Sequence, residues 1–195
     1  MHGLINRSIQ CFLRDTYGAG TWASIAEQAK LDEAGFEAML SYDDAATTAL
    51  LDAACTELAK PRDMLLEDLG TYLVSQPGTR AVRRLLRFGG SDFVDFLHSL
   101  DELHDRARLA VPDLVMPQIE LREHGASAWS LIVRHKLSGF GHALVGVLRA
   151  MADEYGALVL LSHRGRKKNA EVIAIELAEI SFAEGRRFEL GLRAG

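Results

Sequence analysis

The chain has 195 residues, of which 48% are hydrophobic and 25% are charged, the balance of an ordinary globular domain. This length allows one domain with a substantial core. The formal net charge of −5 gives no electrostatic reason to expect nucleic acid, whose binders usually present a basic face.

The N-terminal segment predicts an amphipathic helix that ends at Tyr17 and Gly18, because apolar residues recur at helical spacing: Leu4, Ile5, Ile9, Phe12 and Leu13. The segment has no unbroken apolar run, so it predicts neither a signal peptide nor a membrane span. We therefore expect a cytoplasmic protein without a membrane partner. The two cysteines, Cys11 and Cys55, are too few for a disulfide framework or a thiolate metal site.

Further helices are predicted up to about residue 109. Their starts are indicated by capping residues or by a proline in the first turn: Thr21, Asp43 or Asp44, Pro61, Thr79, and Ser91 or Asp92. The last of these positions predicts one long helix from Phe93 to about Leu109. The first half of the chain is thus expected to be mainly helical.

After Pro117 the apolar pattern changes from helical spacing to alternation. It predicts antiparallel strands near residues 118–124, 128–136, 157–164 and 170–180. One helix, capped by Ser138 and ending near Tyr155, separates the two pairs of strands. The expected fold class is α+β, with a helical N-terminal part followed by a four-stranded antiparallel sheet.

The chain lacks the phosphate-loop, HExxH and GxSxG motifs, so the sequence does not predict an enzyme. One candidate site residue is His104, which continues an apolar face formed by Phe93, Leu97 and Leu100. A histidine in this position can ligate a metal through a neutral imidazole nitrogen. Considered alone, it is more often a core histidine bonded to a carbonyl.

His142 is the second candidate. On the predicted helix it shares a stripe with Gly139, Gly146 and Ala150. Small residues beside a polar one leave room for a flat ligand, although close packing against another helix is the commoner cause of such glycines.

Three segments resemble, in order, the heme nitric oxide/oxygen-binding domain, the sensor domain of soluble guanylate cyclase and its bacterial homologues. They are MHGLINRSI at the start, LRFGGSDFVDFLHSLDELH in the middle and VPDLVMP shortly after. The resemblance runs from Met1 to about Leu177. Its most specific part is Asp101-Glu-Leu-His104, with Pro117 thirteen residues later.

The resemblance implies a heme held between the helical part and the sheet. By position, His104 is then the proximal iron ligand and Pro117 presses on the porphyrin. Ile5 and Ile9 line the distal face, and Leu100 is a further residue expected to contact the cofactor. Residues 1–184 are expected to form a single domain, with a helical subdomain over about 1–60, a heme-pocket part over about 61–184 and a tail at 185–195.

The sequence departs from the family at the Tyr-x-Ser-x-Arg motif, which anchors the heme propionates. Val133, His135 and Leu137 occupy those three positions. An arginine–carboxylate contact is a charge-assisted, bidentate bond, so its loss is expected to weaken heme retention. Arg134, His135 or Lys136 is a candidate substitute, and a basic rim at a strand end is the alternative.

His142 occupies the position from which some oxygen-binding members offer a distal tyrosine. It is a candidate to donate a hydrogen bond to a gas ligand or to coordinate iron, or it has no relation to iron.

Two functions follow from the resemblance. The first is a heme-based sensor of nitric oxide or oxygen that regulates a separate signalling protein, such as a histidine kinase or a diguanylate cyclase. In the family, nitric oxide weakens the iron–histidine bond, and the histidine-bearing helix then shifts. The second is a heme-free protein-interaction module on the same scaffold. His104 and Pro117 favour the first function, and the missing anchor favours the second.

Overall fold

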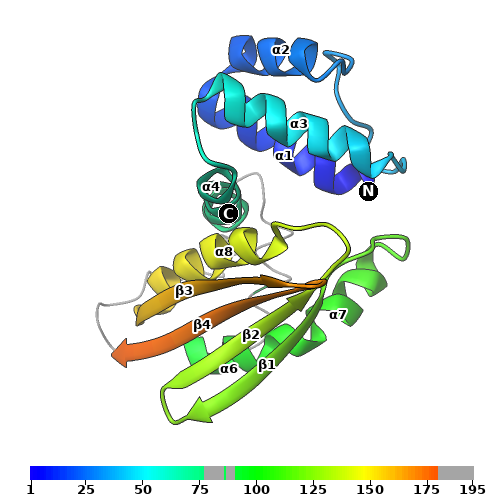
Figure 1. Ribbon diagram of the computed structural model, residues 1–195. Coiled ribbons are helices and arrows are strands. Elements are labelled where there is room, and N and C mark those ends of the chain that lie inside the picture. The colour runs from blue at the N-terminus through cyan, green and yellow to red at the C-terminus, as the bar shows by residue number, and fades with distance from the viewer. Residues whose placement is uncertain (77–85, 87–90, 180–195) are drawn as a thin grey trace, which may run out of the picture.

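The computed structural model describes residues 1–76, 86 and 91–179. Helices α1 (Gly3–Tyr17), α2 (Ala19–Gln28) and α3 (Asp44–Glu57) gather at one end of the molecule, and the sheet lies at the other. Helices α4 (Arg62–Ser75) and α8 (Phe140–Tyr155) lie between them (Figure 1). The predicted α+β class is confirmed.

The N-terminal helices enclose a core of their own. The apolar side of α1 contributes Ile9, Phe12 and Leu13, which pack with side chains of α2, α3 and α4. A buried hydrogen bond of 2.8 Å from Thr47 Oγ1 to Asn6 Oδ1 joins α3 to α1. The spacing of apolar residues, together with this polar pair, fixes which face of α1 turns inward.

The sheet contains β1 (Gln118–Gly125), β2 (Ala128–Arg134), β3 (Leu158–Lys167) and β4 (Ala170–Glu179). Its order is β1-β2-β4-β3, and all neighbours are antiparallel. The four predicted strands are therefore confirmed, with β2 ending two residues early. Alternating side chains point to one face, where they form the core of this part: Ile119, Trp129, Leu131, Val133, Ile173, Ile175 and Leu177.

The prediction of one long helix from Phe93 to Leu109 was wrong. The segment divides into α6 (Phe93–Ser99), a 3₁₀ turn at Leu100–Glu102 and α7 (Leu103–Ala110). Two side chains stabilise the break. Asp101 Oδ1 accepts a 2.8 Å hydrogen bond from the Leu121 backbone of β1, and Arg106 donates to the freed carbonyl of Ser99 at 2.6 Å.

Two helix starts also differ from their prediction. Helix α2 begins at Ala19, and Thr21 donates to the carbonyl of Tyr17 instead of capping the helix. Helix α8 begins after Gly139, whose φ of 108° suits glycine, and Ser138 makes no cap. The helix predicted to start at Thr79 lies outside the described residues.

Helices α4 and α8 cross in unusually close contact. A β-carbon placed on Gly146 would lie 1.9 Å from the carbonyl oxygen of Glu67. One placed on Gly70 would lie 1.9 Å from the carbonyl oxygen of Ala143. Glycine is therefore required on both helices for the backbones to approach this closely. Gly146 of the small-residue stripe near His142 therefore serves this crossing.

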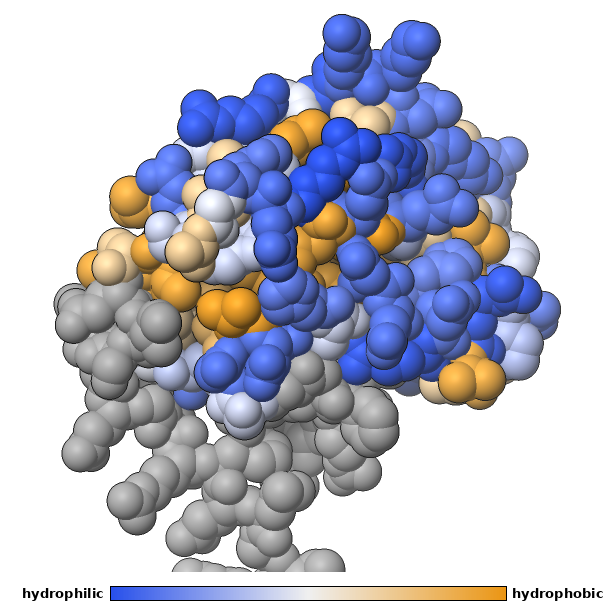
Figure 2. All heavy atoms as spheres, turned by 90° about the horizontal axis from the view of Figure 1, so that it is seen from below, coloured by the Kyte–Doolittle hydropathy of each residue, from blue (hydrophilic) through white to orange (hydrophobic). Residues whose placement is uncertain are grey.

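Figure 2 shows one face of the molecule, on which hydrophilic residues predominate and apolar residues appear between them. The large apolar side chains that are exposed come from several different elements and loops: Met39, Leu40, Met64, Leu109, Val115, Leu158 and Leu160. Among the helices of the described residues, none is long and apolar enough to cross a membrane.

Candidate functional site

His104 lies in the first turn of α7, directly after the 3₁₀ turn. Its Nδ1 is 3.2 Å from the carbonyl oxygen of Met116, and Nε2 has no hydrogen-bond partner among the described residues. This contact is typical of a structural histidine bonded to a carbonyl. It is also the contact that orients a metal-ligating histidine, because a proton on Nδ1 leaves Nε2 as the free donor atom.

Pro117 follows Met116 and is buried immediately before β1. Leu100 is 1% exposed and precedes His104 by one helical turn. The structure therefore brings His104, Leu100 and the Met116–Pro117 segment into one neighbourhood. The role of these residues toward heme stays a prediction.

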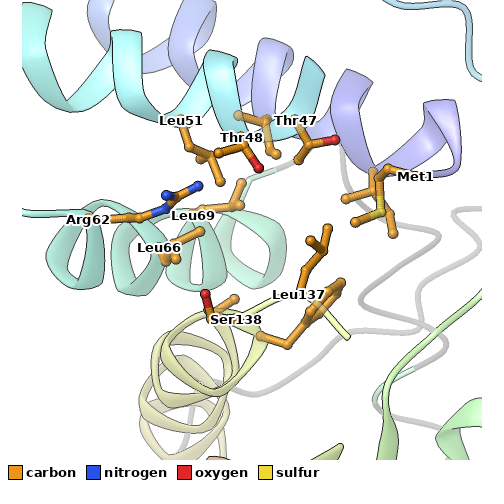
Figure 3. Close-up of a pocket in the computed structure, with 14 residues that line it drawn as sticks. Met1, Thr47, Thr48, Leu51, Arg62, Leu66, Leu69, Leu137 and Ser138 are labelled. Carbon is orange, nitrogen blue, oxygen red and sulfur yellow. The ribbon is translucent and has the colours of Figure 1, made fainter. Parts of the chain in front are cut away.

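Ile5 and Ile9 line a different space. A cavity of about 180 Å³, which we call the Ile5 cavity, lies between α1 and α3 on one side and α4 and the start of α8 on the other (Figure 3). It is lined mainly by apolar side chains: Met1, Ile5, Ile9, Leu51, Leu66, Leu69, Leu137, Phe140 and Ala143. Neither His104 nor His142 is among its lining residues.

The three positions of the propionate-anchoring motif lie in different surroundings. Val133 is 1% exposed in the core beneath the sheet, and Leu137 lines the Ile5 cavity. His135 is half-buried against the ring of Phe140, and its Nδ1 accepts a hydrogen bond from the Leu137 backbone at 3.1 Å. Burial lowers the pKa of His135, which opposes the cationic form that would attract a propionate.

The two basic side chains beside this motif already have acidic partners. Arg134 Nη2 is 2.7 Å from Glu120 Oε2, across the β1–β2 pair. Lys136 Nζ is 2.6 Å from Asp44 Oδ2, and Asp44 also accepts from the N-terminal amine. These contacts lower the pKa of Asp44 to about 2, with the Lys136 hydrogen bond as the largest cause. A propionate would have to compete with each carboxylate.

His142 lies between α4 and the sheet. Its Nδ1 is 3.6 Å from Glu67 Oε1 of α4, and its ring lies against that of His163 on β3. Glu67 also forms an ion pair with Arg149, which lies about two helical turns after His142 on α8. The structure thus places His142 in a polar cluster with His163 and Glu67, away from the cavity that Ile5 lines.

Glu171 completes this cluster and was not identified from the sequence. It is 4% exposed, and its two carboxylate oxygens accept hydrogen bonds from the backbone N–H groups of Gly139 and Gly141, at 2.9 and 2.8 Å. Glu171 therefore replaces the missing side-chain cap of α8. The sequence held one signal for it, because residue 171 shares the alternation of the inward-facing Ile173 and Ile175.

The fit of a heme to these residues is partial. His104 has the orientation expected of an iron ligand. The anchor positions supply no free cation, and Leu97, Leu100 and Leu148 are at most 1% exposed. A porphyrin in contact with Leu100 and His104 would need these side chains to move apart. Within the described residues, no three histidine, cysteine or carboxylate side chains form a metal-binding group.

Comparisons with known proteins agree with the fold and with the sequence resemblance. The chain is 26% identical over 79% of its length to soluble guanylate cyclase gcy-31 of Caenorhabditis elegans, and 22% identical over 84% to soluble guanylate cyclase 89Db of Drosophila melanogaster. It covers only 22% and 24% of these relatives, so their activity as whole proteins is not transferred to it.

Solved structures with the same fold include the Fe(II) unliganded H-NOX protein from K. algicida. The TM-score is 0.76 at 19% identity, and the match covers 92% of this chain and 97% of that one. The I5F mutant of T. tengcongensis H-NOX gives a TM-score of 0.76 at 14% identity, covering 92% and 99% of the two chains. The model of the Haem-NO-binding family matches residues 2–163. The chain therefore belongs to the Haem-NO-binding (H-NOX) family.

Proposed function

We propose that this chain is a cytoplasmic heme-based gas sensor in which His104 ligates the iron. The observation that carries the proposal is the contact between His104 Nδ1 and the Met116 carbonyl, next to Pro117. That contact leaves Nε2 as the donor atom and holds the ring in one orientation. Heme, when bound, would supply an iron that takes a diatomic gas such as nitric oxide or oxygen.

Leu100 and Pro117 would then pack against the macrocycle, and the α6–α7 segment would carry any movement of His104. The 3₁₀ turn before His104 interrupts the helical segment, and Asp101 of this turn is hydrogen-bonded to Leu121 of β1, so the turn is a candidate point at which the segment could pivot. We propose a separate signalling protein, a histidine kinase or a diguanylate cyclase, as the recipient of that movement. The cyclase names of the relatives are in keeping with a signalling role.

A second function, the heme-free interaction module, is favoured by a specific observation. Val133 and Leu137 replace the anchoring side chains, while Arg134 and Lys136 are paired with Glu120 and Asp44. On this alternative, His104 is a structural histidine, and the closed core around Leu100 is the working state of the domain.

Titration of the full chain with hemin, followed by its absorption spectrum, separates the two functions. The sensor requires saturable, one-to-one binding and a shifted Soret band, and His104→Ala should lose most of that binding. The matched control is His124→Ala, because His124 is exposed at the end of β1 and its hydrogen bond within the described part of the chain is to Ser130. Absence of saturable binding, or equal binding by both variants, would exclude a His104-ligated heme and favour the interaction module.

A further inference from the structure

The two edges of the sheet differ in how well they are covered. β1 forms one edge and β3 forms the other, as Figure 1 shows. At β1, the backbone N–H of Leu121 donates to the Asp101 side chain, and the 3₁₀ turn and α7 lie against the strand. Among the described residues, no strand or loop pairs with the outer side of β3. The backbone groups on that side of β3 are therefore open to another strand.

The first half of β3 is apolar on both faces. From Leu158 to His163 the strand contains no lysine, arginine, carboxylate or proline. On the outer face, Leu158 is 37% and Leu160 is 61% exposed. On the inner face, Val159 and Leu161 are only half-buried, whereas the inward side chains of β2 and β4 are buried. Edge strands usually carry charges or proline that prevent pairing, and this half of β3 lacks that protection.

The second half of β3 is basic. Arg166 is bonded within the fold, because its guanidinium donates to backbone carbonyls of the loop before α8. Arg164, Lys167 and Lys168 are exposed and form no ion pair within the described part of the chain. The pairing of β3 with β4 shifts register between His163 and Arg166, so the regular part of the strand is its apolar half. β3 thus offers a pairing segment at one end and exposed cations at the other.

We propose that β3 pairs with β3 of a second copy of this chain, antiparallel and about a two-fold axis near Leu160, so that the two sheets become continuous. The apolar halves of the two strands then lie side by side, and the basic ends point in opposite directions. At about 3.3 Å per residue, the two copies of Arg164 are separated by roughly 26 Å. This distance well exceeds the screening length of about 8 Å at physiological ionic strength, so the basic ends repel each other little.

Charge complementarity favours a second copy as the occupant of this edge. With Leu160 opposite its own copy, the antiparallel direction brings Lys167 toward the end of α8 in the other protomer. The last turn of α8 carries the exposed Asp153, and the carbonyl end of a helix is itself negative. β3 and the helix turn before it are therefore complementary to themselves, apolar to apolar and basic to acidic. Because each copy contributes one edge and β1 is covered, association stops at a dimer.

Sedimentation equilibrium of the full chain tests the proposal, which goes beyond gas sensing and requires no heme. We expect the average mass to rise toward twice that of the monomer as the protein concentration increases. Leu160→Lys should raise the dissociation constant of the dimer about tenfold or more, because it places two like charges opposite each other on the pairing segment. Met64→Lys is the matched control, since Met64 is 53% exposed on α4. It should associate as the wild type does.

A charge exchange tests the antiparallel direction. Asp153→Lys and Lys167→Glu should each weaken the dimer, and the double variant should recover most of the wild-type affinity, because the opposite charges face each other again. Circular dichroism of each variant verifies that the fold is retained. Two losses that add without recovery would overturn the antiparallel arrangement.

The wild type and Leu160→Lys decide the proposal as a whole. A wild-type chain that stays monomeric up to millimolar concentration would overturn it and leave the β3 edge to a segment of another protein. Equal dimer affinity in the wild type and Leu160→Lys would overturn it as well, because the copies would then associate through a different surface.

Discussion

The imidazole rings of His142 on α8 and His163 on β3 are stacked, with centroids 3.8 Å apart and planes inclined by 24°. Carboxylates lie at either end of the pair, because Glu67 is 3.6 Å from His142 Nδ1 and Glu171 is 3.9 Å from His163 Nε2. The Gly165 backbone donates to His163 Nδ1 at 3.2 Å, so a second proton on this ring would remove that bond. The pair therefore connects α4, α8 and the sheet, and the hydrogen bond from Gly165 requires that His163 Nδ1 carries no proton.

Protonation of His163 should lower the stability of the fold. Burial is the main cause that lowers the pKa of His163, and repulsion from His142 adds to it, while Glu171, Glu67 and Asp63 act in the opposite direction. The unfolded chain takes up this proton near pH 6.5, whereas the folded chain takes it up only at lower pH. The free energy of unfolding should therefore fall as the pH falls below about 6.5.

Urea unfolding between pH 5 and pH 8 measures how steeply the free energy of unfolding changes with pH. His163→Leu should reduce this pH dependence. Part of the dependence will remain, because burial also lowers the pKa of His135. The control His124→Gln should keep the wild-type slope, since His124 is exposed. Parallel curves for His163→Leu and wild type would show that His163 does not control the acid sensitivity.

Glu171→Gln should destabilise the start of α8. An amide has one acceptor oxygen, so one of the two backbone N–H groups of Gly139 and Gly141 would face an NH₂ group instead. A buried unsatisfied donor costs about 1–3 kcal/mol. Chemical denaturation should show a loss of this size, against almost none for the exposed Glu176→Gln on the same strand. If Glu171→Gln loses no more stability than Glu176→Gln, the backbone N–H groups of Gly139 and Gly141 do not depend on the carboxylate, and the prediction is contradicted.

Gly146→Ala should strongly destabilise the fold, because the added methyl would meet the backbone of Glu67. Overpacking of this kind typically costs about 1–3 kcal/mol, and backbone contact leaves little room for relief. Gly20→Ala is the matched change in a helix where nothing lies within 4 Å of the new β-carbon. It should stabilise by up to about 1 kcal/mol. Similar thermal midpoints for the two variants would contradict the close α4–α8 crossing.

The sequence predicted the fold well, because the change of apolar spacing after Pro117 is a local signal that packing did not override. The proximity of His104 to the segment before β1 is now seen in its contact with the carbonyl of Met116, the neighbour of Pro117, while the roles predicted for His104 and Pro117 stay predictions. Sequence spacing did not predict the neighbours of His142. Its contact with His163 depends on β3 lying beneath α8, and its contact with Glu67 depends on the glycine crossing with α4, both of which are tertiary.

The role of Glu171 was missed for a related reason. Its alternation with Ile173 indicated an inward side chain, but the backbone N–H groups that it binds belong to the start of α8, some 30 residues earlier. Likewise, Ile5 and Leu137 line one cavity although they are distant in the chain, and the cavity's volume depends on the packing of four separate segments.

Imidazole rescue of His104→Gly tests the central proposal most directly. The full chain is loaded with heme, reduced, and examined by absorption spectroscopy with and without nitric oxide. If His104 ligates the iron, the glycine variant should lose the heme spectrum of the wild type and regain it when millimolar imidazole fills the vacated position. The ferrous protein should also respond to nitric oxide in the wild type and in the rescued variant. An unchanged spectrum in His104→Gly, or a wild type that takes up no heme, would contradict the account.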